Sequence, residues 1–377
     1  MPLPLEGLLV VDFSTLLPGP LATLMLAEAG AEVVKVEKPG GEAMRQFPPA
    51  LGAGSAPYAA LNGAKKSVSV DLKSAAGRRS LEPLLAPADI LVEQFRPGVM
   101  ERLGLGYEAV KRINARIIYC SISGYGQDGP RAQEAGHDLN YQAVTGLLSL
   151  SPGMPAALAA DIAGGAMPAV MNILLALRSR DRTGEGTFLD LAMADTMFTF
   201  AWFGLAEGHA TGRYPGPGEN KLAGGSPRYG LYETADGKIL AVGALEQKFW
   251  DVFCETIELP LPFRDDCRDP SATRQAVAAL IRARPAAEWR RVLEPRNCCC
   301  TLVASLDEAL RDDHFRARGL FQYGVVQGGR RLPMTIVPIA PAFRSGPELE
   351  RSVAAAGEHT GEILDSQDSR APPAQAF

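Results

Sequence analysis

Short apolar runs alternate with helical patterns at the start of the chain. Residues 8–13 are typical of a buried strand and residues 21–29 of a helix, with a Pro/Gly turn predicted at 18–20. The helix is expected to end at Gly30, because glycine readily adopts the left-handed conformation that closes a helix. Residues 31–37 are the next predicted strand. A strand, a helix and a second strand in this order predict a βαβ unit with parallel strands.

The alternation continues as far as residue 121. Strands are predicted at 67–72, 89–93 and 117–121, and a helix at 74–85. The predicted fold class is therefore α/β, with a Rossmann-like large domain built on a parallel sheet. No Gly-x-Gly-x-x-Gly sequence follows the first strand, so a dinucleotide cofactor is poorly supported.

The pattern changes after residue 210. Residues 211–226 are rich in Gly, Pro and Asn and are predicted to be a linker. A hairpin is predicted beyond it, with Asp236 and Gly237 at the turn, and an amphipathic helix follows. We expect a smaller α+β domain at 227–329, and a large domain at 1–210 that is completed by residues 330–377.

Composition and charge narrow the class of protein. A chain of 377 residues is too long for one ordinary core, and 46% hydrophobic with 21% charged residues is a globular composition. The net charge of −5 gives no electrostatic footprint for nucleic acid. No apolar run free of Gly, Pro and charge is long enough to span a membrane, and residues 1–7 lack the basic segment of a signal peptide. We expect a cytoplasmic protein with neither nucleic acid nor membrane as a partner.

The six cysteines follow neither a disulfide framework nor a zinc site. Three of them, Cys298, Cys299 and Cys300, are adjacent and so lack the spacing of a zinc knuckle. Reduced thiols and no bound metal are therefore expected.

Two short segments carry the candidate chemistry. His137 and Asp138 are adjacent, and Asp161 lies among apolar and small residues just before Gly164 and Gly165. His137 and Asp161 are 24 positions apart (161 − 137), so only the fold can bring them to one site. Two bases on opposite faces of a carbon acid are what a racemase needs, and an Asp in apolar surroundings also suits a nucleophile toward an acyl thioester. The alternative is a loop histidine and an aspartate that caps a helix.

Motifs along nearly the whole chain resemble those of the family III CoA-transferase (CaiB/BaiF) superfamily. They occur in order at 11–13, 18–20, 33–39, 70–73, 95–99, 101–104, 123–126, 182–186, 232–237 and 357–360. Within this group the α-methylacyl-CoA racemase branch is the most similar in motif. The resemblance implies an interlocked homodimer with a Rossmann-like large domain and a smaller domain, an acyl-CoA substrate, and no permanently bound cofactor.

The resemblance also implies roles for individual residues. Asp161 corresponds to the catalytic carboxylate of both branches, which forms acyl anhydrides in the transferases and is an acid/base group in the racemases. His137 corresponds to the second acid/base group of the racemases, and Glu246 to the glutamate that supports it. Leu17 stands where the transferase of formyl and oxalyl groups has Gln, which favours the racemase. The connection between His137 and Asp161 is shorter than in the racemases, and residues 40–62 are more similar to the transferases, so CoA transfer between carboxylic acids stays open.

Coenzyme A needs cations for its phosphates and an apolar surface for its adenine. The resemblance implies CoA contacts at Lys38, Asp71, Leu72, Lys73, Gln94, Phe95, Arg96, Arg102 and Asp138. The alternative for each cation is an exposed surface charge, and for Asp138 it is a turn or cap residue. Gly164 and Gly165, if they begin a helix, would leave N–H groups open to stabilise an enolate oxygen.

Overall fold

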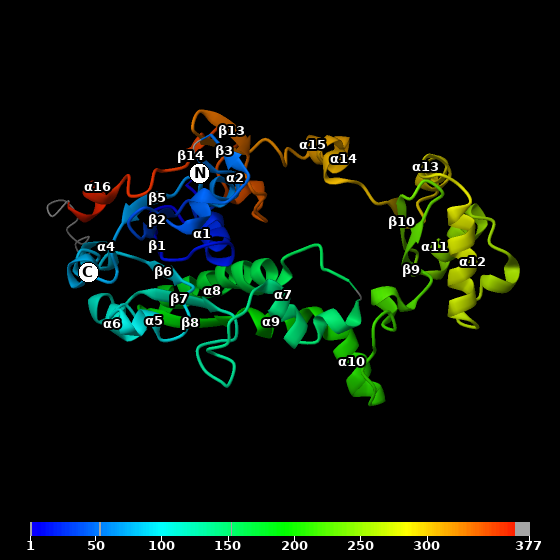
Figure 1. Cartoon of the computed structure of the whole chain (residues 1–377), viewed down its shortest axis with the longest axis horizontal. Coiled ribbons are helices and arrows are strands. Elements are labelled where there is room, and N and C mark those ends of the chain that lie inside the picture. The colour runs from blue at the N-terminus through cyan, green and yellow to red at the C-terminus, as the bar shows by residue number, and fades with distance from the viewer. Residues whose placement is uncertain (1, 53, 152, 366–377) are drawn as a thin grey trace. The chain divides into compact units, whose positions relative to one another are not determined.

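The computed structural model describes residues 2–52, 54–151 and 153–365 (Figure 1). Contacts between residues divide the chain into two units. The first is drawn from residues 1–142, 157–197 and 316–377, and the second from residues 143–156 and 198–315. The domain boundaries from the sequence stay predictions, and the part of them that falls on residues 366–377 lies outside the described residues.

A six-stranded sheet forms the centre of the first unit. Its strands are β1 (Leu9–Asp12), β2 (Glu32–Glu37), β5 (Lys66–Ser69), β6 (Ile90–Glu93), β7 (Ile118–Ser123) and β8 (Thr187–Ala192). They lie in the order β5-β2-β1-β6-β7-β8, and every neighbouring pair is parallel. The predicted α/β fold with a parallel sheet is confirmed.

Helices cover both faces of this sheet, because its strands carry apolar side chains on both sides. The covering helices are α1 (Pro18–Glu28), α4 (Glu82–Leu85), α6 (Tyr107–Ile113), α8 (Met167–Thr183) and α16 (Thr360–Leu364). On one face, Val11, Val34 and Leu91 form a buried cluster with residues of α4, α6 and α16. On the other face, α1 packs against β1, β2 and β6, while α8 packs against β7 and β8.

Two helices depart from their predicted ranges. The predicted turn at 18–20 is wrong, because α1 already begins at Pro18; proline suits the first turn of a helix, where N–H groups have no intrahelical acceptor. The helix predicted at 74–85 is two helices, α3 (Ala75–Arg79) and α4. Pro83 has no N–H to continue the hydrogen-bond ladder of α3, so the second helix starts afresh around it.

The helix that carries Asp161 is widened at its start. A π-helix, Ala160–Ala166, leads without a break into α8. The combined helix, Ala160–Thr183, is apolar enough over its 24 residues to cross a membrane by length and composition alone. Its contacts with α1, β7 and β8 place it in the layer that covers the sheet.

The second unit is built on a small antiparallel sheet with the order β11-β10-β9. Its elements are β9 (Tyr229–Glu233), β10 (Ile239–Gly243), β11 (Cys300–Leu302), α11 (Gln247–Thr256), α12 (Pro270–Arg282) and α13 (Ala286–Leu293). Trp250, Phe253, Val277 and Trp289 from the three helices form its core with the sheet. The predicted hairpin is present, with Gly237 at φ +72° in its turn.

The remaining elements are short. Two further sheets are formed by β3 (Ala50–Leu51) with β4 (Gly54–Ser55), and by β12 (Gly324–Gln327), β13 (Arg330–Pro333) and β14 (Arg351–Ser352). The other α-helices are α2 (Ala56–Asn62), α5 (Val99–Arg102), α7 (Asp138–Val144), α9 (Met193–Phe200), α10 (Trp202–Thr211), α14 (Leu306–Arg311) and α15 (Asp313–Ala317).

Candidate active site

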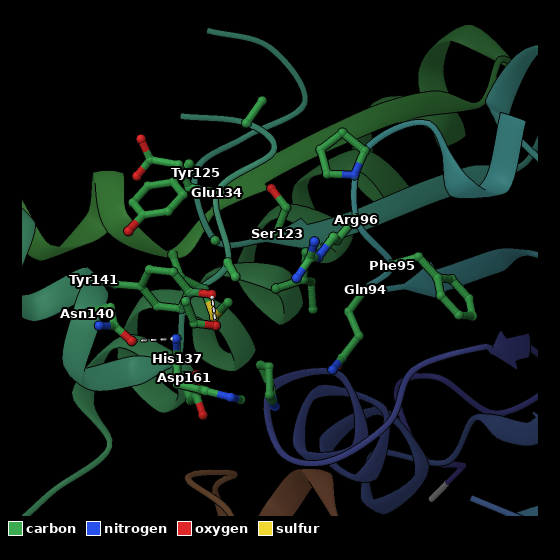
Figure 2. A pocket seen from close by; sticks show the side chains of 18 of the residues that line it. Gln94, Phe95, Arg96, Ser123, Tyr125, Glu134, His137, Asn140, Tyr141 and Asp161 are labelled. Carbon is green, nitrogen blue, oxygen red and sulfur yellow. Dashed lines mark hydrogen bonds between the residues drawn. The ribbon is translucent and has the colours of Figure 1, made fainter. Parts of the chain in front are cut away.

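The carboxyl ends of the parallel strands meet at one edge of the large sheet, where open α/β sheets bind their ligands. A cavity of about 480 Å³ lies at this edge, beyond the ends of β6 and β7 (Figure 2). Its walls come from the segments after β1, β6, β7 and β8 and from the start of the π-helix, and include Gln94, Arg96, Tyr125, His137 and Asp161. The sequence segments with the candidate chemistry therefore converge on one place.

His137 is the residue just before α7, and it lines the cavity. Its N–H donates to Oδ1 of Asn140 at 3.0 Å. Its carbonyl oxygen accepts the N–H groups of Asn140 at 2.8 Å and Tyr141 at 3.3 Å. The residue is exposed, so an imidazole on this well-held backbone is accessible to a substrate in the cavity.

Asp161 is the second proton-handling group in the cavity wall. Burial raises the pKa of Asp161 to about 6, the charge of Asp138 adds to the increase, and His137 opposes it. With such a pKa roughly a tenth of the carboxyl groups are protonated at pH 7. His137 and Asp161 thus face one cavity, and the imidazole is near enough to affect the ionisation of the carboxyl group.

Asp138 ties the segments of these two residues together. Its buried carboxylate accepts the backbone N–H of Asp161 at 3.0 Å through Oδ1, and Nε2 of Gln142 at 2.6 Å through Oδ2. Asp138 thus links the start of α7 to the start of the π-helix. The CoA contact of Asp138 stays a prediction.

The expectation that Gly164 and Gly165 leave N–H groups open at a helix start is wrong. The helix begins before them at Ala160, and both glycines are buried inside the π-helical segment. Their small size permits close packing instead. A Cβ on Gly164 would lie 2.8 Å from the carbonyl oxygen of Met193, and one on Gly165 would lie 3.0 Å from Cβ of Pro18.

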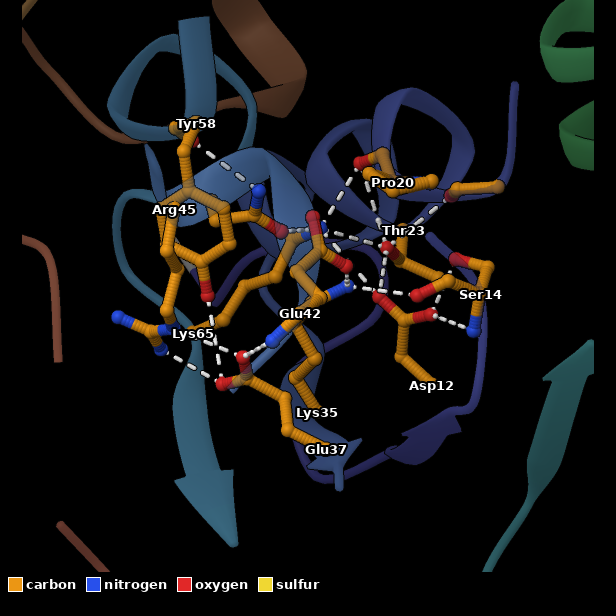
Figure 3. A network of polar contacts seen from close by, with 12 residues as sticks. Asp12, Ser14, Pro20, Thr23, Lys35, Glu37, Glu42, Arg45, Tyr58 and Lys65 are labelled. Carbon is orange, nitrogen blue, oxygen red and sulfur yellow. Dashed lines mark hydrogen bonds and ion pairs between the residues drawn. The ribbon is translucent and has the colours of Figure 1, made fainter. Parts of the chain in front are cut away.

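A buried ionic network supports the loop that brings Leu16 and Pro18 to the cavity (Figure 3). Asp12 accepts the N–H of Ser14 at 2.9 Å and Nζ of Lys65 at 3.3 Å. Burial alone would raise the pKa of Asp12, but the nearby lysines and hydroxyl groups hold it at about 2, so the carboxylate is ionised. This fixed loop holds Leu16 at φ +60°, a conformation that leucine rarely adopts.

Apart from Asp138, the predicted CoA contacts lie at the same edge of the sheet, in the segments that follow β2, β5 and β6. Gln94, Phe95 and Arg96 line the cavity, and Oε1 of Gln94 accepts the N–H of Gly19 at 3.0 Å. The others lie outside its wall, namely Lys38, Asp71, Leu72, Lys73 and Arg102. The four cations among the predicted CoA contacts are exposed, namely Lys38, Lys73, Arg96 and Arg102. All of the CoA contacts stay predictions.

Sequence reasoning missed five polar residues of the cavity wall, namely Ser123, Tyr125, Glu134, Asn140 and Tyr141. The last two lie three and four positions after His137, a spacing that puts residues on one side of a helical turn. Glu246 belongs to the second unit, where it is exposed and precedes α11 as its N-cap. Its contact with His137 stays a prediction.

Among the described residues, no cysteine lines the cavity. Within residues 2–52, 54–151 and 153–365, no three His, Cys, Asp or Glu side chains form a group that could hold a metal ion. The six cysteines are free thiols.

Comparison with known proteins shows similarity over nearly the whole chain. The sequence profile of CoA-transferase family III matches residues 5–360. The chain is 35% identical over 374 residues to alpha-methylacyl-CoA racemase from Homo sapiens, covering 96% of this chain and 92% of that protein. It is 30% identical over 374 residues to acetyl-CoA:oxalate CoA-transferase from Acetobacter aceti, covering 93% of this chain and 94% of that protein. The crystal structure of a CaiB/BaiF family protein from Brucella suis matches with a TM-score of 0.81 and 26% identity, over 97% of this chain and 99% of that one.

Proposed function

Because the chain belongs to CoA-transferase family III, we propose that it is an acyl-CoA racemase, which inverts C2 of 2-methyl-branched acyl-CoA thioesters. Its relatives include a racemase and a CoA-transferase, so the chain is an enzyme in either case. One observation carries the choice of racemase: His137 and Asp161 face the same cavity from separate elements. The similarity to a racemase over 96% of the chain supports it.

Racemisation needs one group to take the C2 proton and another to return a proton to the opposite face. A neutral His137 takes the proton, and the electron pair of the C–H bond moves into the thioester carbonyl to form an enolate. A protonated Asp161 then donates its proton to C2 on the other face, which leaves an imidazolium and a carboxylate. A pKa of about 6 populates both forms of Asp161 near neutral pH, so the pair works in both directions. The support of His137 by Glu246 that the family resemblance implies stays a prediction.

Transfer of CoA between carboxylic acids is the second candidate function. In that cycle the Asp161 carboxylate attacks the thioester carbonyl and the CoA thiolate leaves, which forms an aspartyl anhydride. The thiolate then attacks the Asp161 carbonyl, which releases the first acid and leaves an aspartyl-CoA thioester. The similarity to acetyl-CoA:oxalate CoA-transferase over 93% of the chain favours this candidate. His137 has no proton to move in it, so racemisation accounts for more of the cavity wall.

The test of the racemase is incubation with a 2-methylacyl-CoA of one configuration in deuterium oxide. We expect deuterium at C2, detected by mass spectrometry, and formation of the epimer, detected by chiral chromatography. A protein that binds CoA but puts no deuterium into several branched acyl-CoAs would overturn the proposal.

Arg96 and Arg102 are proposed to bind the phosphates of CoA. Both are exposed in the segment after β6, and a guanidinium binds two phosphate oxygens at once. Replacing Arg96 by Ala should weaken CoA binding by about 1.5–3 kcal/mol, the range for a hydrogen bond to a charged group, and binding should weaken with salt. Calorimetry with CoA measures both effects. Arg112→Ala, an exposed arginine on α6, is the control; unchanged affinity in the Arg96 and Arg102 variants would make these residues ordinary surface charges.

The assembly proposed for this enzyme is an interlocked homodimer in the cytoplasm, with large and small domains at the boundaries predicted above. Met171, Leu174 and Leu175 on α8 are 57%, 45% and 62% exposed. Apolar side chains gathered on the exposed side of one helix support a protein interface there.

A further inference from the structure

We infer that Tyr141 is a positioning residue for His137, which fixes the peptide unit from which His137 projects and clamps the two ends of segment 124–136. Figure 2 shows Tyr141 and Asn140 beside His137 at the cavity. The inference rests on the proposed function, because it concerns the residue that handles one of the two protons.

The peptide unit between Gly136 and His137 is held at both ends. Its carbonyl oxygen accepts the Tyr141 hydroxyl at 2.7 Å, and its N–H donates to Oδ1 of Asn140 at 3.0 Å. The next carbonyl, that of His137, accepts the N–H groups of Asn140 and Tyr141. A peptide unit is planar, so holding both its ends restricts its rotation. The direction in which the His137 side chain leaves the backbone is thereby set by two residues.

The ring of Tyr141 fills the space that side chains at Gly124 and Gly136 would occupy. A Cβ on Gly124 would lie 2.6 Å from Cε1 of Tyr141, and a Cβ on Gly136 would lie 2.7 Å from the same atom. Both distances are well below van der Waals contact, so the ring packs directly on two glycines. Gly124 directly follows β7 and Gly136 directly precedes His137. The ring therefore joins the edge of the sheet to the start of α7.

The hydroxyl of Tyr141 acts as a donor rather than as an acid. Burial raises the pKa of Tyr141 to about 12, Asp161 and Tyr125 add to the increase, and Arg96 opposes it. The hydroxyl group therefore keeps its proton, and can donate to Gly136, throughout the range in which Asp161 titrates. Its contribution to the reaction is geometric.

Two variants remove opposite ends of this support. Tyr141→Phe keeps the ring and loses the donor to Gly136, and Asn140→Ala loses the acceptor of the His137 N–H. Each should slow inversion at C2 by at least about 10-fold with KM within about twofold, because a small misplacement of a catalytic group is costly. Exchange of deuterium on the face served by Asp161 should persist, seen as deuterium in unreacted substrate of one configuration. Tyr107→Phe is the control, since that ring packs against Tyr119 and Phe188 outside the cavity wall.

A second measurement separates this inference from the proposed function. The Cε1–H signal of His137 in the NMR spectrum, assigned by its absence in His137→Gln, should shift or broaden in Tyr141→Phe and not in Tyr107→Phe. An unchanged signal overturns the clamp, whether or not the wild-type protein inverts any acyl-CoA. For an active enzyme, inversion within twofold of wild type in Tyr141→Phe, or equal loss of exchange on both faces, overturns it as well. Failure of the wild-type protein to exchange C2 overturns only the proposed function.

Discussion

Replacing His137 by Gln is expected to lower the rate of inversion at C2 by at least about 100-fold, the lower range for losing a general acid or base. Glutamine keeps a polar side chain but cannot take the C2 proton. Exchange should survive on one face, because Asp161 can still remove a proton and return one from solvent. Substrate of one configuration should therefore gain deuterium without forming its epimer. Mass spectrometry and chiral chromatography of the same samples measure the two processes.

The exchange that survives in His137→Gln should rise with pH through the pKa of Asp161, which lies somewhat above its wild-type value of about 6 once His137 no longer lowers it, and then level off. Asp161 acts as a base only in its carboxylate form, and burial with the charge of Asp138 raises its pKa from 3.8 to about 6. The base form therefore appears at a higher pH than it does for an exposed aspartate. A pH profile of exchange thus reports on the environment of Asp161 directly.

Asp161→Asn should give the complementary result, with exchange limited to the other configuration. Asp181→Asn is the matched control, because Asp181 is an exposed carboxylate on the same continuous helix. It should leave inversion and exchange at the wild-type rates. Loss of exchange for both configurations in either active-site variant would contradict the assignment of one residue to each face.

Local sequence pattern predicted five of the six strands of the large sheet, missed β8, and placed most of those five more closely than the limits of the helices. The apolar runs at 8–13, 31–37 and 89–93 match β1, β2 and β6 because a strand buried on both faces needs apolar residues at nearly every position. The limits of helices depend on whether a proline begins a helix or interrupts one. Pro18 begins a helix where a turn was expected, and Pro83 divides a pattern that otherwise has helical spacing.

The sequence predicted which residue types form the site better than it predicted how they are arranged in space. Residue type and motif were enough to select His137 and Asp161, but their meeting in one cavity depends on the fold of the whole first unit. The predicted role of Gly164 and Gly165, to leave N–H groups open at a helix start, was wrong. It assumed that a helix begins at these glycines, whereas the π-helix begins at Ala160. Asn140 was missed because its side chain accepts a hydrogen bond from the backbone N–H of His137. Residue type alone does not predict such a bond.

Asp161 is expected to remain free of any acyl group during turnover. A racemase moves a proton through this carboxylate, whereas a transferase of this family acylates it as an anhydride and then a thioester. Incubation with acyl-CoA followed by hydroxylamine or borohydride converts such adducts into a hydroxamate or an alcohol. Mass spectrometry of the peptide that contains Asp161 then distinguishes the two, with Asp161→Asn as the unreactive control.

An unmodified peptide together with rapid deuteration at C2 is the outcome that the site predicts. The prediction rests on His137, which lines the cavity. Racemisation uses this residue as a base, whereas the transferase cycle needs no base there. The raised pKa of Asp161 points the same way, because a carboxyl group that is partly protonated near neutral pH can return a proton to C2. A hydroxamate or an alcohol at Asp161, matched by transfer of CoA to an added carboxylate, would instead assign the chain to the transferases.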